Sequence, residues 1–151
     1  MILILIRHGN ASKPEGETQL RLTTRGKKEV IRSAQALQSR QMNLETIWHS
    51  PKRRTVETAG ILLEKAGNPQ TRLEEKKDLE PEGDFRKIYG DLMAEKPGCV
   101  ALVSHLPFLE KLVYLIQEQM DHSSPLEFPT AGIQVFRWDG KWEYLYAINQ
   151  Q

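Results

Sequence analysis

The amino-terminal stretch Met1-Ile2-Leu3-Ile4-Leu5-Ile6-Arg7-His8-Gly9 carries the strongest signal about the fold. Residues 2–6 are continuously apolar and rich in β-branched side chains, which is typical of a strand covered on both faces of a sheet. The run is too short for a membrane span or a signal-peptide core, and no basic stretch precedes it. We therefore expect a buried central strand that delivers Arg7 and His8 to its carboxyl end.

The order of a strand followed by a helix recurs along the chain. Apolar residues at helical spacing follow Thr23 or Thr24, both good N-cap types, and predict a helix to about Arg40. Residues 45–49 form a short second strand that leads into Ser50-Pro51, an N-cap followed by a proline at the first helical position.

The remaining elements extend this pattern to the end of the chain. They are a helix carrying Val56 to Ala66, an extended piece at 71–73, a helix at 85–93, a strand at 99–104 that leads into a helix at His105-Leu106-Pro107, and two alternating segments at 132–138 and 141–148. Asp139-Gly140 between the last two predicts a hairpin turn. We predict one α/β domain over residues 1–151, with a mostly parallel central sheet and a C-terminal antiparallel hairpin.

Composition excludes several classes of protein. The 151 residues include 21 Lys and Arg against 20 Asp and Glu, a net charge of +1, which argues against a nucleic-acid protein that relies on overall basic charge. Hydrophobic residues at 39% are enough to bury a core and argue against disorder. The single cysteine, Cys99, can form neither an internal disulfide nor a metal-thiolate framework, so we expect a cytoplasmic protein.

Charged residues follow three of the predicted strands. Arg7 and His8 follow the first, Arg54 lies in the first turn of the helix after the second, and His105 follows the strand at 99–104. Ligands of open α/β sheets bind outside the carboxyl ends of the strands, so we expect these four side chains to meet there. Two arginines, two histidines and two helix amino termini predict a pocket for a dianion.

Phosphoryl transfer needs such a pocket. Arginine forks match the equatorial oxygens of a transferred phosphoryl group, so Arg7 and Arg54 are the predicted clamps. His8 can attack phosphorus as a neutral imidazole whose other ring nitrogen is held by a hydrogen bond, and Gly9 lets the backbone approach closely. His105, if protonated, would add a donor and a positive charge. Gly9 and Asn10 complete the predicted phosphate-binding set, and the four histidines lack the close spacing of metal ligands.

Four segments together resemble the histidine phosphatase (phosphoglycerate mutase-like) superfamily. They are Arg7-His8-Gly9, Leu22-Thr23-Thr24-Arg25-Gly26, Ser50-Pro51-Lys52-Arg53-Arg54-Thr55-Val56-Glu57-Thr58 and Ser104-His105-Leu106-Pro107, in the expected order. The short chain without a large insertion is most similar to the branch of the phosphohistidine phosphatase SixA. The resemblance implies a three-layer fold with helices on both faces of the sheet. It also implies that His8 becomes phosphohistidine while Arg7, Arg54 and His105 bind the phosphoryl group, and it implies no metal and no organic cofactor.

The general acid is the weakest part of this resemblance. One branch of the superfamily has an aspartate directly after the second histidine, where this chain has Leu106. Another branch uses a glutamate in the middle of the chain, where the candidates are Glu80 first, then Asp78, Glu82 and Asp84. A phosphohistidine substrate has a leaving imidazole that solvent can protonate, so an uncertain acid favours that substrate.

The expected activity is that of a phosphatase acting through His8, with phosphohistidine in a protein as substrate. About 50 residues separate Arg54 from His105, which leaves little chain for a lid and lets a bulky protein partner approach. The alternatives are a phosphatase of small phosphate esters and a non-catalytic module that binds phosphate or a phosphoprotein. The sequence does not predict the oligomeric state.

Overall fold

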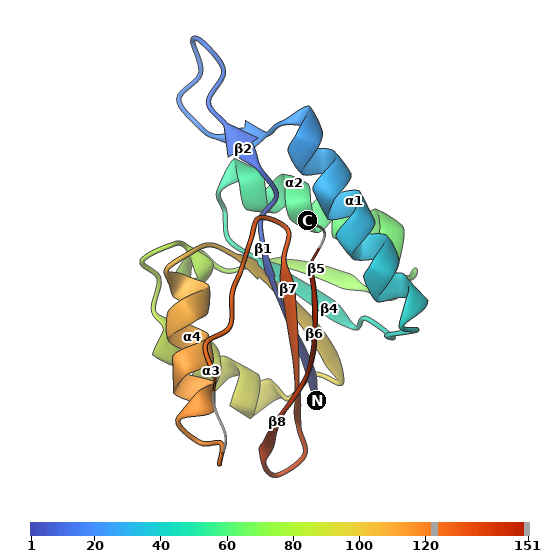
Figure 1. Cartoon of the computed structure of the whole chain (residues 1–151), viewed down its shortest axis with the longest axis vertical. Coiled ribbons are helices and arrows are strands. Elements are labelled where there is room, and N and C mark those ends of the chain that lie inside the picture. The colour runs from blue at the N-terminus through green and yellow to red at the C-terminus, as the bar shows by residue number, and fades with distance from the viewer. Residues whose placement is uncertain (122–123, 150–151) are drawn as a thin grey trace.

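The structure, a computed structural model, describes residues 1–121 and 124–149. Its centre is a six-stranded sheet in the order β5-β4-β6-β1-β7-β8 (Figure 1). The elements are β1 (Ile2–Arg7), β2 (Ala11–Ser12), β3 (Arg21–Leu22), α1 (Thr24–Ser39), β4 (Thr46–His49), α2 (Arg53–Ala66), β5 (Arg72–Glu75), the 3-10 helix η1 (Lys77–Leu79), α3 (Phe85–Glu95), β6 (Cys99–Ser104), α4 (Phe108–Gln117), β7 (Ile133–Trp138) and β8 (Trp142–Ile148).

β1 lies between a parallel and an antiparallel neighbour. It pairs with β6 in parallel, β4 continues the parallel part, and β7 and β8 add the antiparallel hairpin. Gly140 in the hairpin turn has a φ of 100°, the left-handed conformation that favours glycine. The mixed, mostly parallel sheet with a C-terminal hairpin confirms the predicted fold class.

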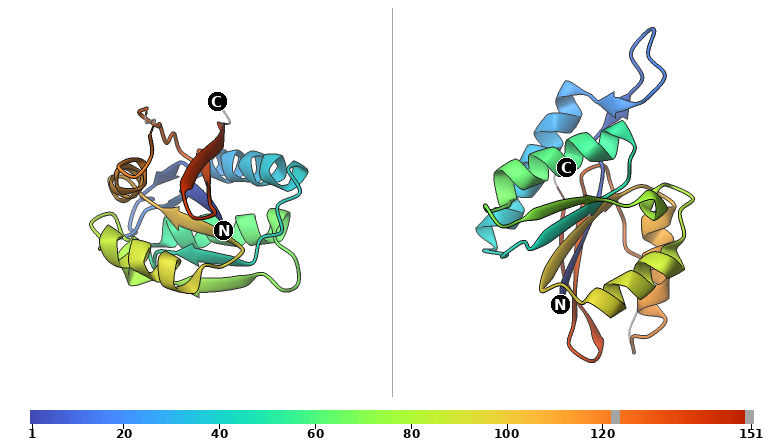
Figure 2. Two further views of the ribbon diagram at one scale, coloured as in Figure 1. Left: turned by 90° about the horizontal axis from the view of Figure 1, so that it is seen from below. Right: turned by 180° about the vertical axis from the view of Figure 1, so that it is seen from behind.

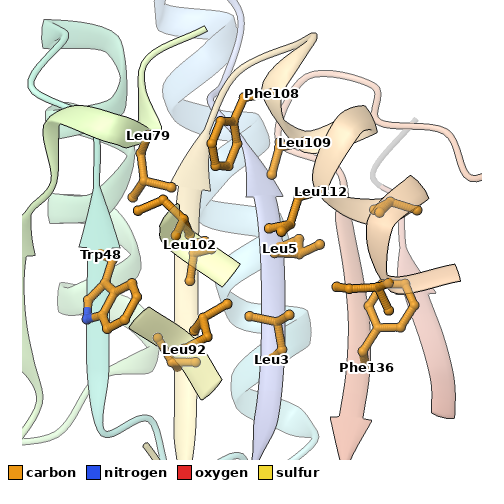
Figure 3. Close-up of a cluster of buried hydrophobic side chains, with 14 of the residues drawn as sticks. Leu3, Leu5, Trp48, Leu79, Leu92, Leu102, Phe108, Leu109, Leu112 and Phe136 are labelled. Carbon is orange, nitrogen blue, oxygen red and sulfur yellow. The ribbon is translucent and has the colours of Figure 1, made fainter. Parts of the chain in front are cut away.

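Helices cover both faces of this sheet. Leu3 and Leu5 point into one apolar cluster, which α3 and α4 complete, and Figure 3 shows part of it around Trp48, Leu112 and Phe136. Ile4 and Ile6 point into a second cluster, to which α1 and α2 contribute. Figures 1 and 2 show the two pairs of helices on opposite sides of the sheet, so the expected three layers are present. The alternation along β1 explains why the whole run is apolar, since both faces are buried.

The first helix begins where the sequence predicts. Thr23 caps α1, with its side chain accepting a hydrogen bond from the Gly26 N–H. Two other predicted helix starts are wrong by one to three residues. α2 begins at Arg53 rather than at Ser50-Pro51, because the Ser50 hydroxyl contacts Thr55 and His105 instead of capping a helix. α4 begins at Phe108, after Pro107.

The sequence did not predict β2 and β3. These two short strands pair with each other, and the loop between them extends away from the rest of the molecule (Figures 1 and 2). Within residues 1–121 and 124–149, no helix is long and apolar enough to cross a membrane.

Candidate active site

The parallel strands bring the predicted residues to one edge of the sheet. Arg7 is aligned with Ser104, so His8 and His105 follow neighbouring strands at the same level. Their rings meet edge to face, with centroids 5.2 Å apart. The positive charges of Arg7 and Arg54 lower the pKa of both histidines, so all four side chains share one electrostatic environment.

His8 has one ring nitrogen that is already bound. Its Nδ1 lies 2.8 Å from the carbonyl oxygen of Gly9. A carbonyl only accepts, so Nδ1 donates, and in the neutral ring the lone pair lies on Nε2. The pKa of His8 is lowered to about 4, mainly by burial. The charges of Arg54 and Arg7 act in the same direction, and the Gly9 hydrogen bond opposes them. His8 is therefore neutral near pH 7, in the tautomer that a nucleophilic Nε2 requires.

His105 is held by a pair of hydroxyl groups. It is 1% exposed, and its Nε2 lies 2.7 Å from Ser50 Oγ, which in turn lies 2.6 Å from Thr55 Oγ1. Its Nδ1 is buried without a hydrogen-bond partner among the described residues. Such a nitrogen is suited to meet a ligand atom.

The pKa of His105 decides its protonation state in the protein alone. Burial lowers its pKa to about 3, and the charges of Arg54, His8, Lys52 and Arg7 act in the same direction. His105 is therefore neutral near pH 7 in the protein alone, and the positive charge of the site comes from the guanidinium groups. A bound dianion would raise this pKa, because opposite charge favours the protonated form.

The two arginines are not neutralised by carboxylates. Arg7 Nη1 donates to the Phe128 carbonyl at 2.9 Å, and its Nε is buried without a partner among the described residues. Arg54 is partly buried, and burial lowers its pKa from the ordinary value. In the described part of the chain, neither residue forms an ion pair, whereas the neighbouring Arg53 contacts Glu17 and Glu57. Two guanidinium groups without an ion pair among the described residues, beside neutral histidines, have the chemistry to bind an anion.

Gly9 is required by close packing. A Cβ at this position would lie 2.7 Å from both the Gly26 carbonyl oxygen and Val30 Cγ2. The Gly9 N–H donates to Thr58 Oγ1 at 3.2 Å, and Thr58 donates to the Arg54 carbonyl at 2.8 Å. The hydroxyl of Thr58 thus joins the backbone beside His8 to the helix turn that carries Arg54.

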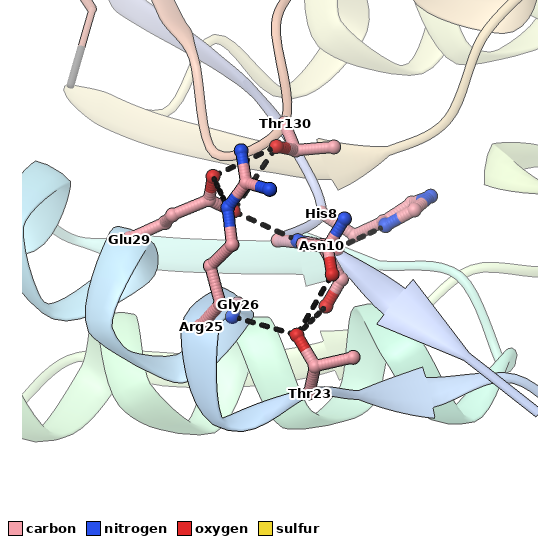
Figure 4. Close-up of polar contacts among 8 residues, drawn as sticks. His8, Asn10, Thr23, Arg25, Gly26, Glu29 and Thr130 are labelled. Atoms are coloured by element: carbon pink, nitrogen blue, oxygen red, sulfur yellow. Dashed lines mark hydrogen bonds and ion pairs between the residues drawn. The ribbon is translucent and has the colours of Figure 1, made fainter. Parts of the chain in front are cut away.

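Asn10 is bound to the start of α1. Its side-chain oxygen accepts a hydrogen bond from the Thr23 hydroxyl at 2.8 Å, and its carbonyl accepts one from the Thr23 N–H at 3.0 Å. Its own N–H donates to Glu29 Oε1 at 3.0 Å, as Figure 4 shows. These contacts anchor the loop after β1; the predicted contact of Asn10 with phosphate stays a prediction.

Glu80 is connected to the site through Lys52. Lys52 Nζ is 3.3 Å from Glu80 Oε2, and the charge of Lys52 lowers the pKa of His105. Lys52 and Glu80 line one pocket of about 580 Å³ with the loop of residues 81–84.

The other three candidate acids have different partners. Asp78 pairs with Lys87, Glu82 pairs with Lys111, and Asp84 caps α3 by accepting the Lys87 N–H. Of the four, Glu80 is the one paired with Lys52, whose charge acts on His105, and its role as general acid stays a prediction.

The sequence did not predict the residues whose hydrogen bonds support the site. Ser50, Thr55 and Thr58 lie inside a quoted segment, but residue type alone does not indicate their hydrogen bonds. In the segment of residues 128–132, Pro129 and Gly132 indicate only a loop, and no residue type there predicts a contact with the site. This segment is hydrogen-bonded to the end of β1. The Arg7 N–H donates to the Gly132 carbonyl, the Arg7 guanidinium donates to the Phe128 carbonyl, and the Ala131 N–H donates to the His8 carbonyl.

No metal site accompanies this cluster. In the part of the chain that the structure describes, no three His, Cys, Asp or Glu side chains are arranged to hold a metal ion. The side chains can bind an anion and present an imidazole nitrogen to it.

The structure is similar to solved structures of histidine phosphatases. A solved structure of the protein histidine phosphatase SixA complexed with tungstate is 26% identical, with a TM-score of 0.85 over 98% of this chain and 96% of that one. Two further solved structures support the fold. The putative phosphohistidine phosphatase SixA from Agrobacterium tumefaciens is 19% identical, with a TM-score of 0.78 over 99% of this chain and 98% of that one. The putative phosphohistidine phosphatase SixA from Nakamurella multipartitia is 18% identical, with a TM-score of 0.82 over 98% of this chain and 95% of that one. No curated protein matches the chain by sequence.

The family model of the histidine phosphatase superfamily (branch 1) matches residues 3–85. This match includes Arg7, His8 and Arg54 and covers more than half of the 151 residues. The chain belongs to branch 1 of the histidine phosphatase superfamily.

Proposed function

We propose that this chain is a phosphatase that forms a phosphohistidine on His8 and that its substrate is phosphohistidine in a protein. The observation that carries the proposal is the state of His8. Its Nδ1 is bound to Gly9, and it lies beside two guanidinium groups that have no carboxylate partner in the described part of the chain. A neutral histidine with a free Nε2 is a nucleophile, and unpaired arginines stabilise the negative oxygens of a phosphoryl group.

The first step transfers the phosphoryl group to the enzyme. His8 Nε2 forms a bond to phosphorus while the phosphorus–nitrogen bond of the substrate breaks, and its electron pair leaves with the substrate imidazole. That imidazole takes a proton from solvent, so no fixed acid is required. Arg7, Arg54 and His105 hold the phosphoryl oxygens throughout.

The second step releases phosphate. Water attacks phosphorus and loses a proton to solvent, and the bond to His8 Nε2 breaks with its electron pair returning to the ring. Inorganic phosphate leaves, and the hydrogen bond from Nδ1 to Gly9 returns His8 to its starting tautomer.

Two observations support a protein as the substrate. The chain is similar over nearly its whole length to a structure described as a protein histidine phosphatase. The residues between Arg54 and His105 are taken up by the rest of α2, β5, η1, α3 and β6, which leaves the loop of residues 80–84 as the main extra chain near the site. A site with so little cover suits a side chain presented by a large partner.

A substrate comparison tests this proposal. We expect hydrolysis of a protein phosphorylated on histidine to be at least about tenfold more efficient, in kcat/KM, than hydrolysis of sugar phosphates or nucleotides. His8→Ala removes the nucleophile and should abolish both activities. Preference for small esters would make the chain a small-molecule phosphatase. Tight binding of the phosphoprotein without released phosphate would make it a binding module.

A further inference from the structure

The peptide bond between Gly9 and Asn10 is hydrogen-bonded at both ends. Its carbonyl oxygen accepts the hydrogen bond from His8 Nδ1 at 2.8 Å. Its N–H donates to Glu29 Oε1 at 3.0 Å. Figure 4 shows His8, Asn10 and Glu29 in this arrangement. One peptide unit therefore separates a carboxylate from the ring of the proposed nucleophile.

Glu29 is an unusual acidic residue in this protein because it is only 5% exposed. Its other contacts are with the Thr130 hydroxyl, at 3.0 and 3.2 Å from the two carboxylate oxygens, and with Arg25 Nε at 3.6 Å. Asn10, Thr130 and Arg25 each present a donor to this carboxylate, and Arg25 is positively charged.

A carboxylate that accepts a hydrogen bond from the N–H of a peptide unit makes the carbonyl oxygen of the same unit a stronger acceptor. Hydrogen bonds in a chain polarise one another, so the negative charge on Glu29 strengthens the Gly9 carbonyl as an acceptor. A stronger acceptor holds the proton on His8 Nδ1. Carboxylates that contact a catalytic imidazole directly fix its tautomer in the same way, and here the peptide stands between the two groups.

We propose that Glu29 is a positioning residue that acts through the Gly9–Asn10 peptide to hold His8 in the tautomer protonated on Nδ1, with Nε2 free to attack phosphorus. The consequence for catalysis rests on the proposed function above. The tautomer itself is a property of the protein without substrate, and it can be measured independently.

The chain provides a matched control at Glu57. Its Oε1 accepts the Leu22 N–H at 2.9 Å, and Arg53 lies 3.8 Å from its other oxygen. Glu57→Gln is thus the same chemical change at a carboxylate that accepts a backbone N–H and has an arginine neighbour. The peptide that Glu57 contacts does not lead to His8.

The experiment compares wild type, Glu29→Gln and Glu57→Gln after labelling the histidine rings with nitrogen-15. Long-range proton–nitrogen spectra at pH 7 report which ring nitrogen of His8 carries the proton, because a pKa of about 4 keeps the ring neutral there. The rate of His8 phosphorylation by a small phosphoramidate donor is measured on the same samples. Thermal unfolding shows that each variant is folded.

We expect wild type and Glu57→Gln to show His8 protonated on Nδ1. Glu29→Gln keeps an oxygen that can accept the Asn10 N–H and removes the negative charge. The tautomer protonated on Nε2 should then appear, and phosphorylation should slow about tenfold, the lower end of the effect of changing a group behind a functional histidine. If Glu29→Gln does not fold, Glu29→Asp against Glu57→Asp makes the same comparison, because the shorter side chain withdraws the charge from Asn10.

An unshifted His8 tautomer in the Glu29 variant would overturn the proposal, even if phosphorylation slowed. A shifted tautomer with an unchanged rate would overturn it as well. A wild-type protein that never becomes phosphorylated would instead refute the proposed function, and the tautomer spectra would still decide whether Glu29 acts on His8.

Discussion

The charges around His8 have two effects on the same ring. Arg7 and Arg54 are the proposed partners of a phosphoryl dianion, and burial together with these two charges lowers the pKa of His8 to about 4. A lowered pKa keeps the imidazole neutral, which is the state that attacks phosphorus. Residue types in the sequence were enough to predict a nucleophile between two arginines. The tautomer was not predictable, because it depends on the 2.8 Å contact between Nδ1 and the Gly9 carbonyl.

The lowered pKa of His8 predicts how stability depends on pH. The unfolded chain binds a proton near the ordinary value of 6.5, whereas the folded protein does so near 4. As pH falls from about 6.5 to 4, the unfolded state gains protons first, so the free energy of unfolding should fall, by on the order of 3 kcal/mol from His8. Denaturant unfolding across this pH range measures the effect.

The control for this prediction is His8→Ala. This variant should lose the part of the pH dependence that His8 causes and keep the part caused by His105, whose pKa is also lowered. Equal slopes of unfolding free energy against pH in wild type and His8→Ala would show that burial does not disfavour protonation of His8.

At the scale of the elements, the strands that form the site were predictable and the segments that support it were not. The apolar runs of β1 and β6 placed Arg7, His8 and His105 at neighbouring strand ends, because parallel strands share a carboxyl edge. The start of α2 was predicted too early, since Ser50 and Pro51 have the chemistry of a helix start. In the folded protein Ser50 contacts His105 instead, a contact between residues 55 positions apart that local patterns cannot reveal.

Thr58 on α2 joins two of these elements. It is fully buried, accepts the Gly9 N–H and donates to the Arg54 carbonyl. Thr58→Val keeps the shape and removes the hydroxyl, so the Gly9 N–H loses its partner. We expect a loss of about 1–3 kcal/mol in the free energy of unfolding and a clear fall in phosphatase activity.

Thr58→Ser is the matched variant, because it keeps the hydroxyl and removes a methyl group. We expect it to stay close to wild type in activity. Urea unfolding and phosphate release measured on both variants make the comparison. A Thr58→Val protein with the stability and activity of wild type would show that this hydrogen bond does not hold the loop to α2.

The whole molecule has a net charge of +1, but its charged residues differ in whether they form ion pairs. Most of the ion pairs in the described residues lie on the surface, and they include Lys87 with Asp78 and Asp91 and Arg137 with Glu143. Among residues 1–121 and 124–149, Arg7 and Arg54 at the carboxyl edge of the sheet form no such pair. The sequence predicted this gathering of positive charge from strand order, while the neutral state of His105 depends on burial that only the folded chain defines.

The central claim is that His8 accepts a phosphoryl group, and brief incubation with a radiolabelled phosphodonor tests it. We expect acid-labile, base-stable label on wild type, little or none on His8→Ala, and at least about tenfold slower labelling of Arg54→Lys, because lysine lacks the planar fork. Arg53→Lys, at an arginine that contacts Glu17 and Glu57, should label like wild type. Peptide mapping that places the label on His8 would bear out the account, and equal labelling of wild type and His8→Ala would contradict it.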